Sequence, residues 1–358
     1  MLAVVLVGGE GTRLRPLTLS TPKQMLPVVE QPMIERVLGH LAHHGVDEAV
    51  LSLGYLPEAF LRAYPDGVAA GVRLSYAVEP EPLDTAGAVR FAARHAGVDD
   101  TFVVVNGDVL TDLDVGALLD FHRRRDAEGT IALHPVDDPS SFGVVPTDAG
   151  GRVTAFVEKP PPGEAPTHLI NAGTYVLEAS ALDRIPGGRQ VSIERETFPA
   201  MVADGRLFAR QDDAYWLDTG TPAAYLQAHR DLLEGRRPGP PAPGARQVEE
   251  GYWVLGRPSV AGKVAGASLV ADGASVATGA QVERSALGPG AVVEAGATVV
   301  ESVLLAGARV GAGATVAGSV LGRAAVVGHG GEVRPVSVLG DGAAVPPGTV
   351  VDGERVTA

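Results

Sequence analysis

Short apolar runs alternate with segments of helical periodicity over the first 234 residues. Runs rich in β-branched residues predict strands at Leu2–Val7, Glu48–Leu53, Arg73–Val78 and Thr101–Asn106. Apolar residues three and four apart predict helices at Pro32–His44, Thr85–His95 and Val115–Arg124, with Pro32 in a first helical turn. This alternation is typical of an α/β domain with a doubly wound, mostly parallel sheet. Ligands of such sheets lie beyond the carboxyl ends of the strands, so we expect chemistry in the loops after Val7, Val78 and Asn106.

A different pattern begins after a segment rich in Pro, Gly and Arg at residues 235–247, which predicts a linker between domains at 1–234 and 248–358. Beyond it, aliphatic residues recur six apart from Val264 to Val333, and Ser-containing triplets recur every 17 residues from Ser268. Such a repeat predicts a solenoid with three short strands per coil and aliphatic residues pointing inward. It resembles the left-handed parallel β-helix of hexapeptide-repeat proteins, and its regular register argues against a disordered tail.

The net charge of the chain argues against two classes of binding partner. Of the 358 residues, 29 are Lys or Arg and 43 are Asp or Glu, so the net charge of −14 repels nucleic acid and anionic lipid. There is no cysteine, which excludes disulfides and thiol chemistry. The apolar start Met1–Val7 is too short for a signal peptide, and no run reaches membrane-spanning length. We therefore expect a cytoplasmic protein that binds neither nucleic acid nor membrane.

A glycine-rich loop follows the first expected strand and contains Gly8, Gly9, Gly11 and Arg13. Its backbone N–H groups can approach a phosphate or a base without a Cβ in the way. The loop matches neither the G-x-G-x-x-G nor the Walker A fingerprint. Arg13 and the nearby Lys23 would clamp a triphosphate, although lone cations are often ordinary surface residues.

Two carboxylates stand out by their setting. Asp108 ends the buried run from Thr101, where carboxylates commonly hold Mg²⁺ that bridges substrate phosphates. Asp218 precedes an expected helix, and taken alone it would be a helix cap or a turn residue. Glu158-Lys159 and Asn171 flank further extended runs and could face a sugar, or lie on a solvated edge.

Nine motifs, taken together, resemble the sugar-1-phosphate nucleotidyltransferase family, and within it the mannose-1-phosphate guanylyltransferases. They occur in family order and read GGEGTRLRPLT, PKQMLP, EPLDTAG, VVNGDV, SSFGVV, FVEKP, INAGTY, SIERETFP and WLDTGTP. The resemblance implies a Rossmann-like catalytic domain before a β-helix. It also implies a Mg²⁺-dependent enzyme that joins a nucleoside triphosphate to a sugar 1-phosphate and releases pyrophosphate.

The resemblance also implies a site, residue by residue. Asp108 and Asp218 would hold the metal, and Arg13, Lys23 and Lys159 would join them as the catalytic groups. The nucleotide contacts would be Leu6, Gly8, Gly9, Gly11, Thr12, Arg13, Lys23, Glu79, Thr85, Gly87 and Asn106. The sugar contacts would be Gly143, Glu158, Lys159 and Asn171. One departure is Asp84, which stands where the guanylyltransferase loop usually has glycine; if that position needs a positive φ, Asp is among the better substitutes.

The reaction needs no proton transfer, because the attacking phosphate oxygen is already ionised, so cations and a metal suffice without a His or Ser triad. Glu79 favours guanine, since a carboxylate accepts from the N1–H and the amine of that base, although Glu79 could equally be a solvated loop acid. Thymidylyl or uridylyl transfer to glucose 1-phosphate is the alternative, and a regulatory homologue without catalysis is a further one.

The β-helix is expected to serve homo-oligomer assembly; acyl transfer at its single histidine, His329, is less favoured. A chain ending near Gly244 is expected to fold and to keep measurable activity.

Overall fold

The computed structural model describes residues 1–249 and 251–358, which form two compact units. The first unit consists of residues 1–9 and 34–216. The second unit consists of residues 10–33 and 217–358. The glycine-rich loop is therefore divided: Gly8 and Gly9 belong to the first unit, and Gly11 and Arg13 belong to the same unit as the C-terminal repeat. The expected division along the chain at residues 234 and 247 stays a prediction.

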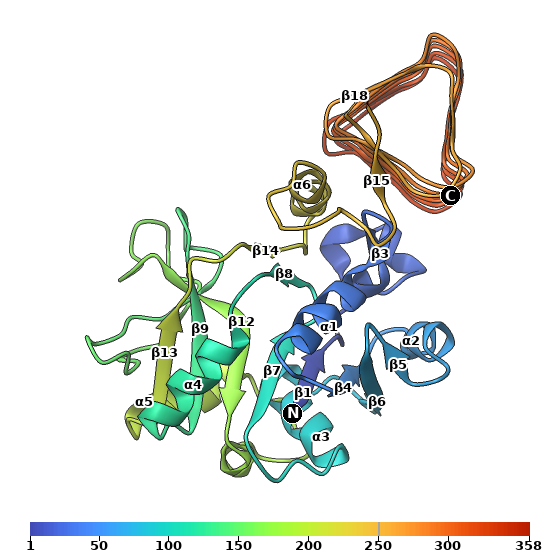
Figure 1. The fold of residues 1–358 in the computed structure, drawn as a ribbon. Coiled ribbons are helices and arrows are strands. Elements are labelled where there is room, and N and C mark those ends of the chain that lie inside the picture. The colour runs from blue at the N-terminus through green and yellow to red at the C-terminus, as the bar shows by residue number, and fades with distance from the viewer. Residues whose placement is uncertain (250) are drawn as a thin grey trace. The chain divides into compact units, whose positions relative to one another are not determined.

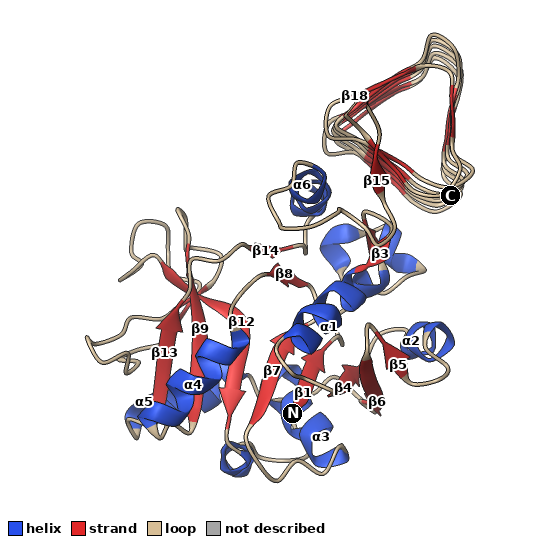
Figure 2. Cartoon of the chain, in the orientation of Figure 1, coloured by secondary structure: helices blue, strands red, loops and turns tan. Residues whose placement is uncertain are grey.

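The centre of the first unit is a parallel sheet in the strand order β7-β1-β4-β6 (Figures 1 and 2). These strands are β1 (Leu2–Leu6), β4 (Glu48–Leu53), β6 (Val72–Val78) and β7 (Phe102–Asn106). Each agrees with the sequence expectation to within one residue. The fold class expected for this part of the chain is confirmed.

Strands in antiparallel pairing, which was not expected from the sequence, extend the sheet beyond β7. They are β9 (Gly129–Pro135), β10 (Gly143–Val144), β11 (Val157–Glu158) and β12 (Leu169–Leu177). Strand β13 (Leu207–Gln211) pairs in parallel with β9, and β5 (Val68–Ala69) pairs antiparallel with β6. Short β8 (Val109–Thr111) follows β7, and β14 (Trp216–Asp218) lies where the chain passes from the first unit to the second.

Helices lie between the strands. They are α1 (Met33–His43), α2 (Pro57–Ala63), α3 (Asp84–His95), α4 (Val115–Arg125), α5 (Phe198–Ala203) and, in the second unit, α6 (Pro222–Leu233). The placement of Pro32 in the first turn of α1 is wrong. Pro32 instead ends the hairpin of β2 (Pro27–Val28) and β3 (Gln31–Pro32), because a two-residue turn at Val29 and Glu30 pairs Pro32 with Pro27.

The C-terminal repeat forms a parallel β-helix whose triangular section is visible in Figure 1. One sheet contains β15 (Arg246–Gln247), β16 (Trp253–Val254), β19 (Leu269–Val270), β22 (Ala286–Leu287), β25 (Val303–Leu304), β28 (Val320–Leu321), β31 (Val338–Leu339) and β34 (Arg355–Val356). The second contains β17 (Ser259–Val260), β20 (Ser275–Val276), β23 (Val292–Val293), β26 (Arg309–Val310), β29 (Val326–Val327) and β32 (Ala344–Val345). The third contains β18 (Lys263–Ala265), β21 (Gln281–Glu283), β24 (Thr298–Val300), β27 (Thr315–Ala317), β30 (Glu332–Arg334) and β33 (Val350–Asp352).

Buried serines explain the spacing of 17 residues. The N–H of Ser285 donates to Ser268 Oγ at 3.2 Å, and the same bond joins Ser302 to Ser285 and Ser319 to Ser302. Each hydroxyl also donates to a carbonyl, so a polar group that the core would leave unsatisfied is paired at every coil. The ladder ends before Ser337, where the step is 18 residues and Ser319 Oγ donates to Arg334 O instead. In the described parts of the chain, no helix is long and apolar enough to cross a membrane.

Candidate active site

The first glycines of the loop allow two backbone segments to approach each other. A Cβ at Gly54 would lie 2.9 Å from Gly8 O, and a Cβ at Gly8 would lie 3.3 Å from Glu79 Oε1. Leu6, at the end of β1, accepts the N–H of Gly107 at 2.9 Å. The loops after β1, β4, β6 and β7 therefore meet at the carboxyl edge of the sheet, where the sequence places the nucleotide.

Glu79 is held at this edge by two donors. Its Oε1 accepts from Ser52 Oγ at 2.9 Å, and its Oε2 accepts from the N–H of Leu83 at 3.1 Å. Burial raises the pKa of Glu79, and the two hydrogen bonds lower it in part. Each carboxylate oxygen has a second lone pair, so the fixed carboxylate can still accept from a base.

The start of α3 explains the unusual Asp84. Its φ is +58°, in the left-handed region, which the glycine of the resembled family motif suggested for this position. Asp84 Oδ1 accepts the N–H of Thr85 at 2.7 Å, which offsets part of the backbone strain. The departure from the family pattern therefore keeps the shape of the loop.

Thr85 and Gly87 make contacts within the protein. Thr85 Oγ1 donates to Glu194 Oε2 at 2.7 Å and accepts the N–H of Ile193 at 2.8 Å. A Cβ at Gly87 would lie 2.9 Å from Leu83 Cβ, and its N–H donates to Val191 O. Thr85 thus joins α3 to the π-helical turn Ile193–Thr197, and Gly87 joins it to the segment just before that turn. Their assignment to the nucleotide stays a prediction.

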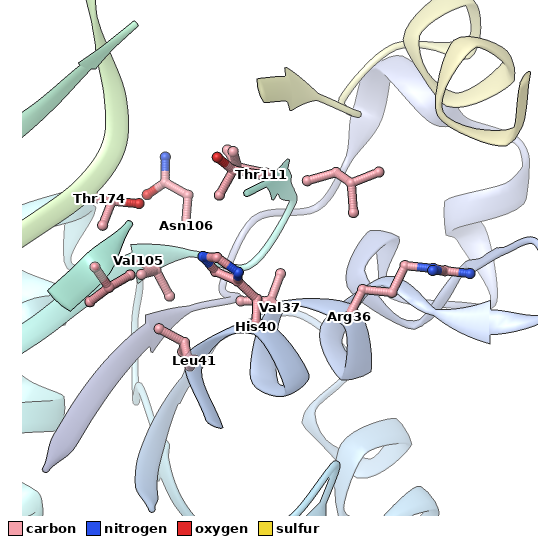
Figure 3. A pocket seen from close by; sticks show the side chains of 11 residues that line it. Arg36, Val37, His40, Leu41, Val105, Asn106, Thr111 and Thr174 are labelled. Atoms are coloured by element: carbon pink, nitrogen blue, oxygen red, sulfur yellow. The ribbon is translucent and has the colours of Figure 1, made fainter. Parts of the chain in front are cut away.

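Asn106 ends β7, and Asp108 follows it in a turn. A Cβ at Gly173 would lie 2.6 Å from Asn106 Nδ2, so the lack of a side chain at Gly173 makes room for the amide. Asn106 also lines a small hollow between α1, β7 and β8 (Figure 3). In that view Asn106 and Thr174 lie at one side of the hollow and the Arg36 guanidinium at the other.

Gly143, Glu158 and Lys159 come together through strand pairing. Gly143 of β10 is the register partner of Glu158 of β11. A Cβ at Gly143 would lie 2.7 Å from the Phe156 ring and 3.0 Å from Glu158 Oε2. Lys159 adopts a φ of +49°, and its Nζ lies 3.5 Å from Glu158 Oε1. The Glu158 carboxylate and the Lys159 ammonium are thus neighbours, and only glycine fits at position 143 on the paired strand.

Asn171 lies at an irregularity of β12, where the register with β9 shifts before Tyr175. Its Nδ2 donates to Tyr175 Oη at 2.8 Å, and its Oδ1 accepts the N–H of Gly173 at 3.0 Å. Trp216 Nε1 donates to Ala172 O at 2.9 Å across this irregular segment. Such irregularities of a strand are over-represented next to active sites.

In the second unit, Gly11 allows the loop to fold over Lys23. Gly11 has a φ of +61°, and its Cβ would lie 3.0 Å from Thr18 Cγ2 and 3.1 Å from Lys23 Cβ. Thr18 Oγ1 donates to Gly11 O at 2.8 Å. Any side chain at Gly11 would be strained and crowded. The stem of Lys23 is therefore packed against the turn that leads into Thr12 and Arg13.

Arg13 and Asp218 face each other in the same unit. Arg13 Nη2 lies 3.9 Å from Asp218 Oδ2, and Asp218 Oδ1 accepts the N–H of Gly220 at 2.8 Å. A Cβ at Gly220 would lie 2.5 Å from Arg13 Nη2. The N-cap of α6 is Thr221, whose Oγ1 accepts from Ala224 N, so Asp218 is not the cap of this helix. The alternative interpretation of Asp218 as a cap is wrong, although it does shape the turn at Gly220.

The predicted metal ligands were Asp108 in the first unit and Asp218 in the second. Among the described residues, no group of three or more His, Cys, Asp or Glu could hold a metal ion. Mg²⁺ usually keeps several waters and binds through one or two carboxylates together with substrate phosphates. A pair of aspartates is a donor set that fits this mode of binding.

Sequence reasoning missed several residues that shape these groups. Phe156 limits position 143 to glycine, Trp216 holds the bulge of β12, and Glu194 holds Thr85. The motifs FVEKP, WLDTGTP and SIERETFP contained all three, but nothing in them said which strand each side chain would reach.

Comparisons with known proteins identify the family of the chain. The chain matches the family model described as nucleotidyl transferase over residues 2–235 and the one described as GMPPB C-terminal domain over residues 264–358. It is 44% identical over 280 residues to the mannose-1-phosphate guanylyltransferase of Mycobacterium tuberculosis, covering 78% of this chain and 72% of that protein. It is also 44% identical over 232 residues to the mannose-1-phosphate guanyltransferase of Gibberella zeae, of which the alignment covers 62%.

A solved structure shows the same catalytic fold. HddC from Yersinia pseudotuberculosis, complexed with GMP-PN, is 29% identical with a TM-score of 0.56. The match covers 64% of this chain and 99% of HddC.

Proposed function

The chain belongs to the nucleotidyl transferase family, and we propose that it transfers GMP from GTP to mannose 1-phosphate, giving GDP-mannose and pyrophosphate. A phosphate oxygen of the sugar 1-phosphate attacks the α-phosphorus of the triphosphate in line. The new P–O bond forms as the bond to the β-phosphate oxygen breaks, and pyrophosphate leaves with both electrons of that bond. The nucleophile is already an anion, so no general base is required.

The protein's own task is to hold two anions that repel each other. Arg13 and Lys23, brought together by the turn at Gly11, bind the triphosphate and neutralise charge that moves to the leaving pyrophosphate. Lys159 binds the phosphate of the sugar, with Glu158 and Asn171 on sugar hydroxyls and Gly143 giving backbone access. These roles follow from the chemistry and from the family pattern.

The single observation that carries the proposal is the Arg13–Asp218 arrangement. Gly220 leaves room for the guanidinium, and the carboxylate is oriented by the turn at Gly220 with one oxygen directed to Arg13. Arg13 is 62% exposed and its Nη2 lies 3.9 Å from Asp218, so a phosphate can reach the guanidinium. A guanidinium and a carboxylate arranged in this way can bind a substrate phosphate and a metal ion, respectively.

Enzymes of this family use a divalent metal, and we propose Mg²⁺ as the ion used here. Asp108 and Asp218 would hold it together with phosphate oxygens and water. When bound, the ion supplies charge neutralisation at the triphosphate. Asp218 would then have two partners, the metal ion and Arg13.

Guanine selection is assigned to Glu79. Its carboxylate is fixed by Ser52 and the N–H of Leu83 next to Gly8, where no Cβ blocks a base. As an acceptor it complements the two adjacent donors of guanine. The name of the relative in Mycobacterium tuberculosis and the GMP-PN complex of HddC support the same base.

A substrate panel tests the proposal. Pyrophosphate release is measured with GTP, dTTP and UTP, each paired with mannose 1-phosphate and glucose 1-phosphate, with and without Mg²⁺. We expect the highest kcat/KM with GTP and mannose 1-phosphate in the presence of Mg²⁺. A preference for dTTP or UTP with glucose 1-phosphate would establish the alternative specificity, and no release with any pair would favour the regulatory homologue.

The oligomer is a separate proposal, in which the β-helix joins copies of the chain. Its outer surface includes exposed Val326, Val336 and Val350. Light scattering on the full chain and on a chain ending at Gly244 compares their masses. A folded shorter chain with the same oligomeric state as the full chain would contradict this role.

A further inference from the structure

The segment that carries Arg13 and Lys23 has little regular structure of its own. Residues 10–33, which we call the clamp loop, contain three-residue 3₁₀ turns at Thr12–Leu14, Leu17–Leu19 and Lys23–Met25 and the hairpin β2–β3. Helical turns this short are marginal without tertiary contacts. What the clamp loop packs against therefore decides where its two cations lie.

One face of the clamp loop contacts the β-helix at a single corner. Arg323 Nη1 donates to Thr21 Oγ1 at 2.9 Å, and Ser20 Oγ donates to Asp341 Oδ2 at 2.9 Å. Arg323 and Asp341 also form an ion pair at 3.6 Å. Beside them, a Cβ at Gly340 would lie 3.0 Å from the ring of Pro16. Thr21 is two residues before Lys23, so this contact is close in sequence to the catalytic cation.

A second corner of the β-helix has the same backbone-to-aspartate hydrogen bond but does not contact the clamp loop among the described residues. The N–H of Arg323 donates to Asp341 Oδ1 at 2.8 Å, and the N–H of Arg257 donates to Asp272 Oδ1 at 2.7 Å. Both arginines follow a glycine whose Cβ would collide with that aspartate. In the described chain, no hydrogen bond or ion pair joins the Arg257 side chain to the clamp loop. The bond from the arginine N–H to the aspartate is therefore a feature of the β-helix corner itself. The side-chain bonds of Arg323 and Asp341 to the clamp loop are additional to it.

The other end of the clamp loop is strained and held by α6. Val29 and Glu30 both have positive φ, +47° and +66°, which is unfavourable for a β-branched residue. The N–H of Val29 donates to His229 Nδ1 at 3.3 Å, and Tyr225 Oη donates to Pro27 O. Such a conformation persists only where its surroundings determine it. The loop is therefore anchored at both sides, by α6 and by the corner at Arg323.

We propose that Arg323 is a positioning residue of the nucleotidyl transfer reaction, through which the C-terminal β-helix sets the position of the clamp loop. It touches no substrate, and it acts through Thr21 on Lys23 and Arg13. The inference rests on the proposed function, because it takes these two cations as the triphosphate clamp. It gives the β-helix a part in catalysis within one chain, independent of assembly.

Kinetics of Arg323→Ala against the matched control Arg257→Ala test the proposal in the full chain. We expect Arg323→Ala to lower kcat/KM for the triphosphate by about tenfold to a hundredfold, as small misplacements of binding groups do. KM for the triphosphate should rise more than KM for the sugar 1-phosphate. Arg257→Ala should match the wild type. Equal kinetics for the two variants would overturn the proposal, as would an equal rise in both KM values.

A second pair of variants separates positioning from folding. Thr21→Val removes the hydroxyl and keeps the shape, so it should reproduce part of the Arg323→Ala effect. In a Thr21→Val background, Arg323→Ala should cost less than it does alone, because the shared bond is already lost. Full additivity of the two changes would contradict the coupling. If Arg323→Ala does not fold, Thr21→Val and Ser20→Ala carry the same kinetic test.

Amide hydrogen exchange gives a readout that does not depend on activity. Exchange in residues 17–26 should be faster in Arg323→Ala than in Arg257→Ala, while exchange in the β-helix strands stays the same. Unchanged exchange in the clamp loop would refute the anchoring even in an active enzyme. If the wild type releases no pyrophosphate with any substrate pair, the proposed function fails, and faster exchange would still support the anchoring.

Discussion

Replacing Glu30 with glutamine tests how the buried turn of the clamp loop responds to pH. Burial raises the pKa of Glu30 from 4.5 to about 7, and the nearby Arg323 guanidinium lowers it in part. Glutamine keeps the size of the side chain and has no better access to the positive φ of +66°, so the backbone strain is unchanged. The variant therefore removes proton binding and little else.

The contribution of Glu30 to the free energy of unfolding depends on pH, because its pKa differs between the folded and the unfolded chain. The unfolded carboxyl loses its proton near pH 4.5 and the folded one near pH 7, so the stabilising contribution is full below 4.5 and is lost as the pH rises through 7. The difference between the two pKa values corresponds to at most about 3 kcal/mol. The side chain is only partly buried, so we expect about 1–3 kcal/mol after solvent screening.

Thermal unfolding at pH 5 and pH 8 measures this difference. At pH 5 the Glu30→Gln variant and the wild type should unfold at similar temperatures. At pH 8 the variant should unfold roughly 2–12 °C higher, taking about 2–4 °C per kcal/mol for a unit of this size. Glu10→Gln, which removes an exposed carboxylate paired with Arg15, is the control and should show no such dependence. A constant gap at both pH values would refute the reasoning.

Three further predictions concern the site itself. Asp108→Asn and Asp218→Asn should each lower kcat by a few orders of magnitude. A near-normal kcat for Asp218→Asn would show that Asp218 only shapes the turn at Gly220. Glu79→Gln should reduce the preference for GTP over dTTP by about 1–3 kcal/mol in relative kcat/KM; an unchanged preference would place base selection elsewhere. Gly143→Ala brings a Cβ to 2.7 Å from Phe156 and should raise KM for the sugar 1-phosphate about tenfold, so an equal change in KM for GTP would contradict the assignment.

The anchoring of the clamp loop also changes one expectation from the sequence. A chain ending near Gly244 was expected to keep measurable activity, because all nine motifs precede the repeat. Such a chain lacks Arg323 and Asp341, which hold Thr21 and Ser20. We now expect the shorter chain to lose activity by at least as much as Arg323→Ala does.

Local patterns were enough to predict much of this protein. The parallel strands and the helices between them follow from apolar periodicity, which depends only on near neighbours. The β-helix follows from its repeat, because each coil contacts mainly the next. The positive φ at Asp84 could be predicted from the glycine of relatives, since backbone strain at one residue is a local property.

Tertiary structure decided what lies together across long stretches of chain. Arg323 and Thr21 are 302 positions apart, and Asp341 and Ser20 are 321 apart. The antiparallel half of the sheet, the room for Arg13 at Gly220 and the contact of Thr85 with Glu194 also join distant segments. No periodicity or motif contains such pairs, because they depend on how all the elements pack. The sequence by itself thus predicted which residues carry the chemistry, and only the packing brought Ser20 and Thr21 of the clamp loop against the C-terminal repeat.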